Sequence, residues 1–77
     1  MKEFVSFIAK HLVDSPDNVS IEETQPNDKT VELTLKVNAD DVGKVIGKQG
    51  KTAQAMRTLL TAIAAKDGKR AILKILD

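Results

Sequence analysis

The sequence predicts an α+β fold with the element order α-β-β-α-α-β, in which helices cover one face of a three-stranded sheet. Three observations predict this fold. Apolar residues recur at helical spacing near the start and in the second half of the chain, and they alternate with polar residues in two segments between. A final run is rich in Ile and Leu. Because 77 residues suffice for one small domain, we expect residues 1–77 to form a single domain.

The first predicted element is a helix that ends before Pro16, because the residue before a proline avoids the helical conformation. Its apolar side chains lie at helical spacing. They are Phe4, Val5, Ile8 and Leu12, with Phe7 and Ala9 widening the apolar arc. We expect Phe4 and Phe7 in the core or in an interface. We expect His11 to be exposed or half-buried in the last turn, where it favours the helix dipole.

A β-hairpin is predicted next. Apolar and polar residues alternate from Val19 to Glu22 and again, more clearly, from Val31 to Val37. The residues 25–29 between them, Gln-Pro-Asn-Asp-Lys, are typical of a turn. Since one face of this hairpin is apolar and the other polar, we expect helices on a single face of an antiparallel sheet.

The second half of the sequence predicts two helices and a strand. Residues 38–41 supply an N-cap to a short helix that Gly47 interrupts, and a longer helix runs from Gly50 to a stop at residues 67–68. The buried stripe predicted for the longer helix is Met56, Leu59, Leu60 and Ile63, with Gln54, Arg57, Thr58 and Thr61 outside. Residues 71–76 are predicted as a strand, although periodicity alone also allows a helix there.

The composition excludes several classes of protein. Cysteine is absent and histidine occurs once, so disulfides, thiolate metal sites and histidine metal clusters are excluded. No apolar run is long enough to span a membrane. A small domain has little room for a catalytic cavity beside its core. We therefore expect a soluble cytoplasmic protein that is not an enzyme, with no cofactor, no small-molecule substrate and no membrane contact.

The charge is divided unevenly along the chain. Residues 1–41 carry four basic and nine acidic side chains, a net charge of −5, whereas residues 42–77 carry eight basic and two acidic side chains, a net charge of +6. A basic half of this kind favours a polyanionic partner. A solvated helix surface explains the charges equally well, so local geometry has to decide.

The segment Asp41–Thr52 supplies that geometry, because its glycines flank two polar residues between two predicted helices. Glycines at both ends of this loop lack Cβ atoms, so a sugar–phosphate backbone can approach the main chain. The helix that follows directs unpaired N–H groups and the positive end of its dipole to the same place. Lysines add charge, and aliphatic residues offer surface for a base. The candidate binding residues are Val42, Lys44, Val45, Ile46, Gly47, Lys48, Gln49, Gly50, Lys51 and Arg57.

Residues 45–50, Val-Ile-Gly-Lys-Gln-Gly, resemble the VIGxxG signature of KH domains, and the predicted element order is similar to the type II arrangement. In KH domains this loop clamps about four nucleotides of a single strand. The whole chain resembles the KhpA family of small bacterial RNA-binding proteins. That resemblance implies a cytoplasmic single-stranded RNA binder and RNA chaperone, whose RNA groove has the second strand as its far wall.

The resemblance also implies partners and a physiological role. The protein would pair with itself or with a KhpB (Jag-like) partner, and it would influence cell elongation and cell-wall synthesis through the RNAs it contacts. A wide apolar arc on the longer helix, about 200° against the roughly 100° of a surface helix, favours a dimer. It comprises Ala53, Ala55, Met56, Leu59, Leu60, Ala62, Ile63 and Ala64. Alanines that merely tolerate exposure are the alternative explanation.

Two other functions compete with RNA binding as explanations of the glycine-rich segment. Residues 50–52, Gly-Lys-Thr, mimic the end of a phosphate-binding P-loop, but Val45 stands where that motif requires glycine, which argues against an NTPase. A KH-fold scaffold that binds proteins and has little affinity for RNA is the second possibility. With its two aromatic residues in the first helix, the chain is expected to bind RNA weakly and in a salt-sensitive way.

Overall fold

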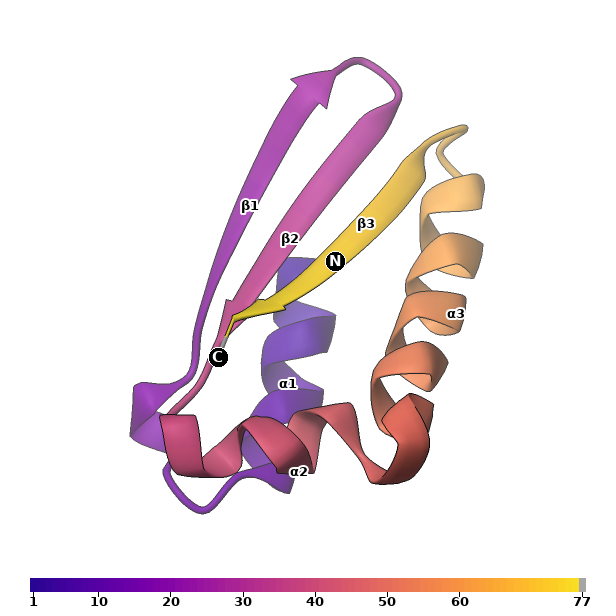
Figure 1. The fold of residues 1–77 in the computed structure, drawn as a ribbon. Coiled ribbons are helices and arrows are strands. Elements are labelled where there is room, and N and C mark those ends of the chain that lie inside the picture. The colour runs from indigo at the N-terminus through magenta and orange to yellow at the C-terminus, as the bar shows by residue number, and fades with distance from the viewer. Residues whose placement is uncertain (77) are drawn as a thin grey trace.

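The computed structural model describes residues 1–76 and has the element order that the sequence predicts, α-β-β-α-α-β (Figure 1). The helices are α1 (Lys2–Leu12), α2 (Val42–Ile46) and α3 (Lys51–Ala65), and the strands are β1 (Ser20–Asn27), β2 (Thr30–Lys36) and β3 (Arg70–Leu76). Single 3₁₀ turns precede β1, α2 and α3 at Pro16–Asn18, Ala39–Asp41 and Lys48–Gly50. The final apolar run is therefore a strand, which settles the one segment that periodicity left open.

The three strands form a mixed sheet in the order β1-β2-β3, with β2 in the centre. β1 and β2 are an antiparallel hairpin, whereas β3 runs parallel to β2, with Leu33 opposite Leu73. The expectation of an antiparallel sheet was wrong for β3. The chain leaves β2, passes through α2 and α3 over one face, and enters β3 in the direction of β2, as parallel strands joined by a helical crossover do (Figure 1).

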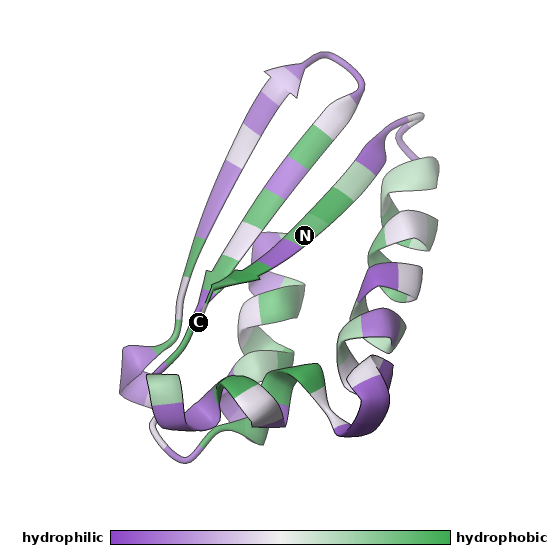
Figure 2. Cartoon of the chain, viewed as in Figure 1, coloured by the Kyte–Doolittle hydropathy of each residue, from purple (hydrophilic) through white to green (hydrophobic). Residues whose placement is uncertain are grey.

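All three helices lie on one face of the sheet, as predicted (Figure 1). On β2 the buried side chains Val31, Leu33 and Leu35 alternate with more polar ones, which Figure 2 shows as alternating colours along the strand. Helix α1 adds Val5 and Ala9 to the same core. The other buried apolar residues of this core are Val13, Ile21, Val37, Val45, Met56, Leu60 and Leu73.

Strand β1 extends further than the sequence suggests, because part of the predicted turn belongs to it. The strand continues through Pro26 to Asn27, and the turn is confined to residues 28–29. β1 lies at an edge of the sheet, where a missing N–H group is tolerated, and its register with β2 shifts between Thr24 and Asn27. The Asn27 side chain stabilises the turn by accepting a hydrogen bond from the Lys29 amide at 2.9 Å.

Helix α3 begins and ends where the sequence predicts, but its buried stripe is rotated. Gly68, at φ +68°, ends the helix: its amide donates to Ala65 O, and the next amide donates to Ala64 O. The stripe that faces the core is Ala53, Met56, Leu60 and Ala64. Leu59 and Ile63 were wrongly placed in it: Leu59 is 49% exposed, and Ile63 is only half-buried. Successive residues of a helix project about 100° apart, and here Leu60 and Ala64 face the core.

Candidate nucleic-acid interface

The loop between α2 and α3 is held in a backbone conformation that requires glycine. Helix α2 ends where the Gly47 amide donates to Gly43 O at 2.9 Å, and Gly47 itself has φ +79° and ψ 173°. Gly50 has φ +74°, and Gln49 between them has φ +57°, an uncommon value for a residue with a side chain. Three positive φ values within four residues turn the chain sharply from α2 into α3, so the residues 48 and 49 project from the corner.

The two glycines have different roles. A Cβ atom on Gly47 would lie 2.6 Å from the Thr52 Cβ, so this glycine is needed for the loop to pack against the first turn of α3. A Cβ atom on Gly50 would meet nothing within 4 Å. The expectation that both glycines leave room for a phosphate backbone was therefore wrong for Gly47, where Thr52 fills the space. Gly50 is the position with open space beside the main chain.

Two amides at the start of α3 donate hydrogen bonds inside the loop. The Gly50 amide donates to Gly47 O at 3.1 Å, and the Lys51 amide donates to Lys48 O. Neither amide is free for a ligand, contrary to the expectation of wholly unpaired N–H groups at this helix start. Sequence reasoning missed these bonds because they form only in the 3₁₀ turn, which the positive φ of Gln49 makes possible.

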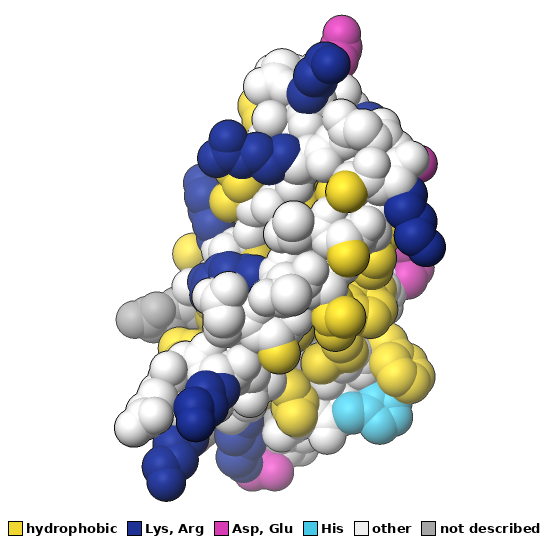
Figure 3. Space-filling model, turned by 90° about the vertical axis from the view of Figure 1, so that its right-hand side faces the viewer, with side chains coloured by type: hydrophobic (Ala, Val, Ile, Leu, Met, Phe, Trp, Pro, Cys, Tyr) yellow, Lys and Arg dark blue, Asp and Glu magenta, His cyan; other side chains and the backbone are white. Residues whose placement is uncertain are grey.

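The polar side chains of the loop face solvent. Lys48, Gln49 and Lys51 are all exposed. Figure 3 shows one group of Lys and Arg side chains at the lower end of the molecule, where Figure 1 places the α2–α3 loop, and others spread over the rest of this face. An exposed loop that carries two lysines beside a bare glycine has the chemistry to hold an anionic backbone.

Lys44 differs from these two lysines because its ammonium group has carboxylate partners. It forms an ion pair with Asp14, and its Nζ lies 3.6 Å from an oxygen of the buried Asp41. The hydrogen bond to Asp14, together with the charges of both carboxylates, raises the pKa of Lys44 above its ordinary value. Asp41 is only three residues from Lys44, but Asp14 lies 30 residues away, so no local pattern indicated its part in this cluster.

The aliphatic residues near the loop do not form one exposed wall. Val45 is fully buried in the core, so its expected contact with a base was wrong: the five-residue helix α2 uses this position to pack on the sheet. Val42 and Ile46 are half-buried. The strand beside α2 and α3 is β3, not the predicted second strand β2, which lies at the centre of the sheet (Figure 1).

Arg57 connects α3 to that neighbouring strand. Its Nε donates a hydrogen bond to the Leu73 carbonyl of β3 at 3.4 Å. The side chain is still exposed, so the arginine lies between the helix surface and the sheet edge. The sequence placed Arg57 on the outside of α3 but gave no indication of this bond.

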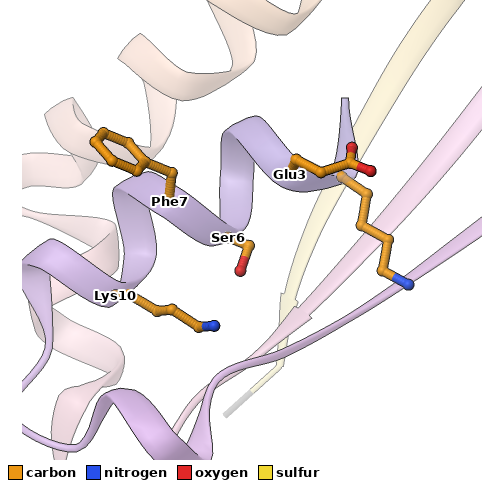
Figure 4. Close-up of a pocket in the computed structure, with 5 residues that line it drawn as sticks. Glu3, Ser6, Phe7 and Lys10 are labelled. Carbon is orange, nitrogen blue, oxygen red and sulfur yellow. The ribbon is translucent and has the colours of Figure 1, made fainter.

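Two hollows on the surface lie away from the loop. One runs along α1 and is lined by Lys2, Glu3, Ser6, Phe7 and Lys10; in Figure 4, Phe7 points to the other side of α1 from Lys10. A second lies on the open face of the sheet between Ser20, Glu22, Thr34, Lys36 and Leu76. Among residues 1–76, no three His, Asp or Glu side chains are grouped so as to hold a metal ion.

The exposed apolar side chains are concentrated on α1 and α3. Phe7 is 64% exposed, and its ring lies 4.4 Å from that of His11, centroid to centroid. The position of His11 is as expected: it is exposed in the last turn, where its Nδ1 lies 2.8 Å from Phe7 O. Figure 3 shows hydrophobic side chains in one continuous area that reaches the histidine.

Comparison with known proteins identifies relatives along the whole length of the chain. Residues 2–75 match the family model "KhpA/KhpB, KH domain". The chain is 49% identical over 77 residues to an RNA-binding protein KhpA of Aquifex aeolicus, which covers all of the chain and 96% of the relative. It is 50% identical over 76 residues to the protein of that name in Caldanaerobacter subterraneus and 46% identical to that of Clostridium perfringens, in each case covering 99% of the chain and 100% of the relative.

No solved structure matches the chain significantly. Within the described residues 1–76, the helices are too short or too polar to cross a lipid bilayer. The match to the family model spans the sheet, all three helices and the glycine loop, and the relatives match along the full length of the chain. This chain therefore belongs to the KhpA/KhpB family of KH domains.

Proposed function

We propose that this protein is a non-catalytic, single-stranded RNA-binding protein whose RNA backbone crosses the Gly47–Gly50 loop. The observation that carries the proposal is the open space at Gly50, with exposed Lys48, Gln49 and Lys51 around it. The relatives named RNA-binding protein KhpA support RNA as the ligand.

In this arrangement a phosphate is held mainly by side chains. Lys48 and Lys51 supply positive charge, and Gly50 lets the backbone of the RNA come close to the main chain. Since the Gly50 and Lys51 amides already donate within the loop, main-chain contacts to phosphate fall to other amides of the corner. Half-buried Ile46 and Val42, with Arg57 beside β3, are the neighbouring residues that a base can reach.

The affinity of one domain is expected to be low. Both aromatic residues lie on α1, so the loop has no stacking platform of the kind worth about 1–3 kcal/mol per base. Binding then depends on phosphate contacts, which weaken steeply as the salt concentration rises.

The double variant Lys48→Asp/Gln49→Asp tests the loop. It reverses the charge of the corner without touching the core, so we expect native circular dichroism and at least about a tenfold loss of affinity for a short RNA strand. The matched control is Gln25→Asp/Lys66→Asp, which makes the same chemical changes in exposed residues at the other end of the molecule. If the Lys48→Asp/Gln49→Asp variant kept its affinity for RNA and its native circular dichroism, the RNA-binding site could not be this loop.

We also propose that a second copy of the chain covers the apolar surface between α1 and α3. On α3 the exposed residues Ala55, Leu59 and Ala62 follow one another at i, i+4 and i+7, so they form one stripe, and Phe7 is exposed on α1. Two linked RNA sites would compensate for weak single-site binding by raising the effective concentration.

Family membership supports a wider proposal about the role in the cell. A KhpB (Jag-like) protein is then the alternative occupant of the α1–α3 surface, and the protein acts as a cytoplasmic RNA chaperone that influences cell elongation and wall synthesis. The test is crosslinking and sequencing of bound RNA in cells, with cell length measured in a strain that carries the Lys48→Asp/Gln49→Asp variant. A protein-binding scaffold, the alternative function, would recover no RNA above background and would keep normal cell length in that strain.

A further inference from the structure

Asp41 is a buried carboxylate that connects two distant parts of the chain. It is only 2% exposed, and among residues 1–76 no other charged side chain is buried. One of its oxygens accepts a hydrogen bond from the Ser15 amide at 3.1 Å, and the other lies 3.6 Å from the Lys44 Nζ. Ser15 belongs to the link between α1 and β1, whereas Lys44 belongs to α2.

Lys44 strengthens this connection, because it pairs with a carboxylate on each of the two segments. Its ammonium group contacts Asp14 in the same α1–β1 link as well as Asp41 at the start of α2. Helix α2 has only five residues, and its last one immediately precedes Gly47. The orientation of α2, and with it the corner at Gly47–Gly50, therefore depends on how firmly α2 is held to the α1–β1 link.

If Lys44 bound a phosphate of the RNA, it would have to give up its ion pairs with Asp14 and Asp41, and this would destabilise the protein. The exposed pair with Asp14 is worth little by itself. Asp41 is different, because a buried carboxylate that loses its positive partner keeps its charge in a poorly solvated place. Among residues 1–76, the lysines that form ion pairs are Lys44 and Lys74, and neither Lys48 nor Lys51 does so.

From this geometry we infer that Lys44 is a positioning residue: held by Asp41 and Asp14, it fixes α2 and the RNA-binding corner and makes no contact with phosphate. The inference rests on the proposed function and assigns Lys44 and Lys48, which the sequence groups together, to different tasks. Lys48 contacts the ligand, and Lys44 holds the element that presents Lys48.

The salt dependence of RNA affinity separates the two tasks. Each phosphate contact on a single strand contributes about 0.7 to the slope of log affinity against log salt. Lys48→Gln should reduce that slope by about 0.7, whereas Lys44→Gln should lower the affinity several-fold at every salt concentration and leave the slope unchanged. A slope reduced equally by both variants would overturn the inference.

A second comparison uses the partners of Lys44. If Lys44 were available to phosphate, Asp14→Asn would release it and raise the affinity more than Asp17→Asn, which removes the same charge from the same link without an ion pair. We expect Asp14→Asn to raise the affinity no more than Asp17→Asn does. We also expect Lys44→Gln to cause no further loss in an Asp41→Asn background, because Lys44 acts through Asp41. An equal loss in both backgrounds would contradict this.

The failure of the proposed function can be told apart from failure of the inference. If the wild-type chain bound no RNA, the proposed function would be wrong. The inference would then be tested by NMR on the protein without RNA. Lys44→Gln should then shift the backbone amide resonances of residues 47–50, and should shift them no further in the Asp41→Asn background. Resonances of the corner that stay unmoved in Lys44→Gln would overturn the inference. If Asp41→Asn does not fold, the single variant Lys44→Gln still decides by the same measurements.

Discussion

Thr52 fills the space that a side chain on Gly47 would need: a Cβ atom there would lie 2.9 Å from the Thr52 backbone nitrogen as well as 2.6 Å from its Cβ. A backbone atom cannot rotate away as a side chain can. The first glycine of the loop is therefore required by the fold of the loop itself, before any ligand is considered.

Gly47→Ala should accordingly destabilise the protein more than Gly50→Ala does. Gly47 combines φ +79° and ψ 173°, a conformation that costs other residues about 1–3 kcal/mol, and the clash with Thr52 adds to this cost. Gly50 has an ordinary left-handed conformation and open space, so its substitution should cost about 1–2 kcal/mol. Urea unfolding of both variants measures the difference. Equal free energies of unfolding would show that the loop relaxes around Gly47.

RNA affinity should respond to Gly50 in a different way. A methyl group at Gly50 occupies the side where we place the RNA backbone, so Gly50→Ala should lose affinity although it remains folded. The measurement is a titration with a short RNA strand under conditions in which the variant is fully native by circular dichroism. Gly68→Ala is the control, because Gly68 also has a positive φ and open space but lies at the other end of α3. If Gly50→Ala bound RNA as tightly as Gly68→Ala does, the RNA backbone would not pass beside Gly50.

Local patterns in the sequence were sufficient for the elements and for the exposed loop. Periodicity of apolar residues and the glycines that end α2 and α3 act over a few residues, so they can be recognised in the sequence. The direction of β3 depends on the path of the whole α2–α3 crossover, and the edge position of β1 decides whether Pro26 can lie in a strand. Neither is a local property.

The same limit applies to the site. Lys44, Lys48 and Lys51 look alike in the sequence. What separates Lys44 is its pairing with Asp14, 30 residues away, and with Asp41, which tertiary packing buries. Val45 lies within the motif but is buried, because a five-residue helix has few positions with which to contact the sheet. A motif predicts where a ligand approaches, whereas tertiary packing decides which of its side chains remain available.

Leu59→Lys should disrupt self-association if a second copy covers the α1–α3 surface. Leu59 is 49% exposed, so a lysine there is tolerated by the monomer but would place a charge inside an apolar interface. Sedimentation at tens of micromolar should change from dimer to the 8.4 kDa monomer. Thr58→Lys, on the neighbouring exposed position, should remain dimeric. A wild-type chain that is monomeric would instead leave the surface to a different partner.

The stability contribution of Lys44 should depend on pH only in strongly alkaline solution. Its pKa is raised above 10.5 in the folded protein, chiefly by the hydrogen bond to Asp14, so the folded state holds this proton more tightly than the unfolded state does. The contribution is then complete below the pKa of the unfolded chain, and it is lost as the pH rises through the higher pKa of the folded protein. Around neutral pH it should be constant.

Thermal unfolding of the wild type and of Lys44→Gln, measured from pH 7 to pH 11.5, checks this. All other charged groups are common to the two proteins, so the difference between the two melting temperatures isolates Lys44. That difference should be flat from neutral pH up to about pH 9.5 and should shrink at higher pH, as Lys44 loses its proton first in the unfolded chain and then in the folded protein. Lys69→Gln is the matched control, and its difference from the wild type should show no such decrease. A difference that already declines between pH 7 and pH 9 would mean that the ammonium group is not held by Asp14 and Asp41.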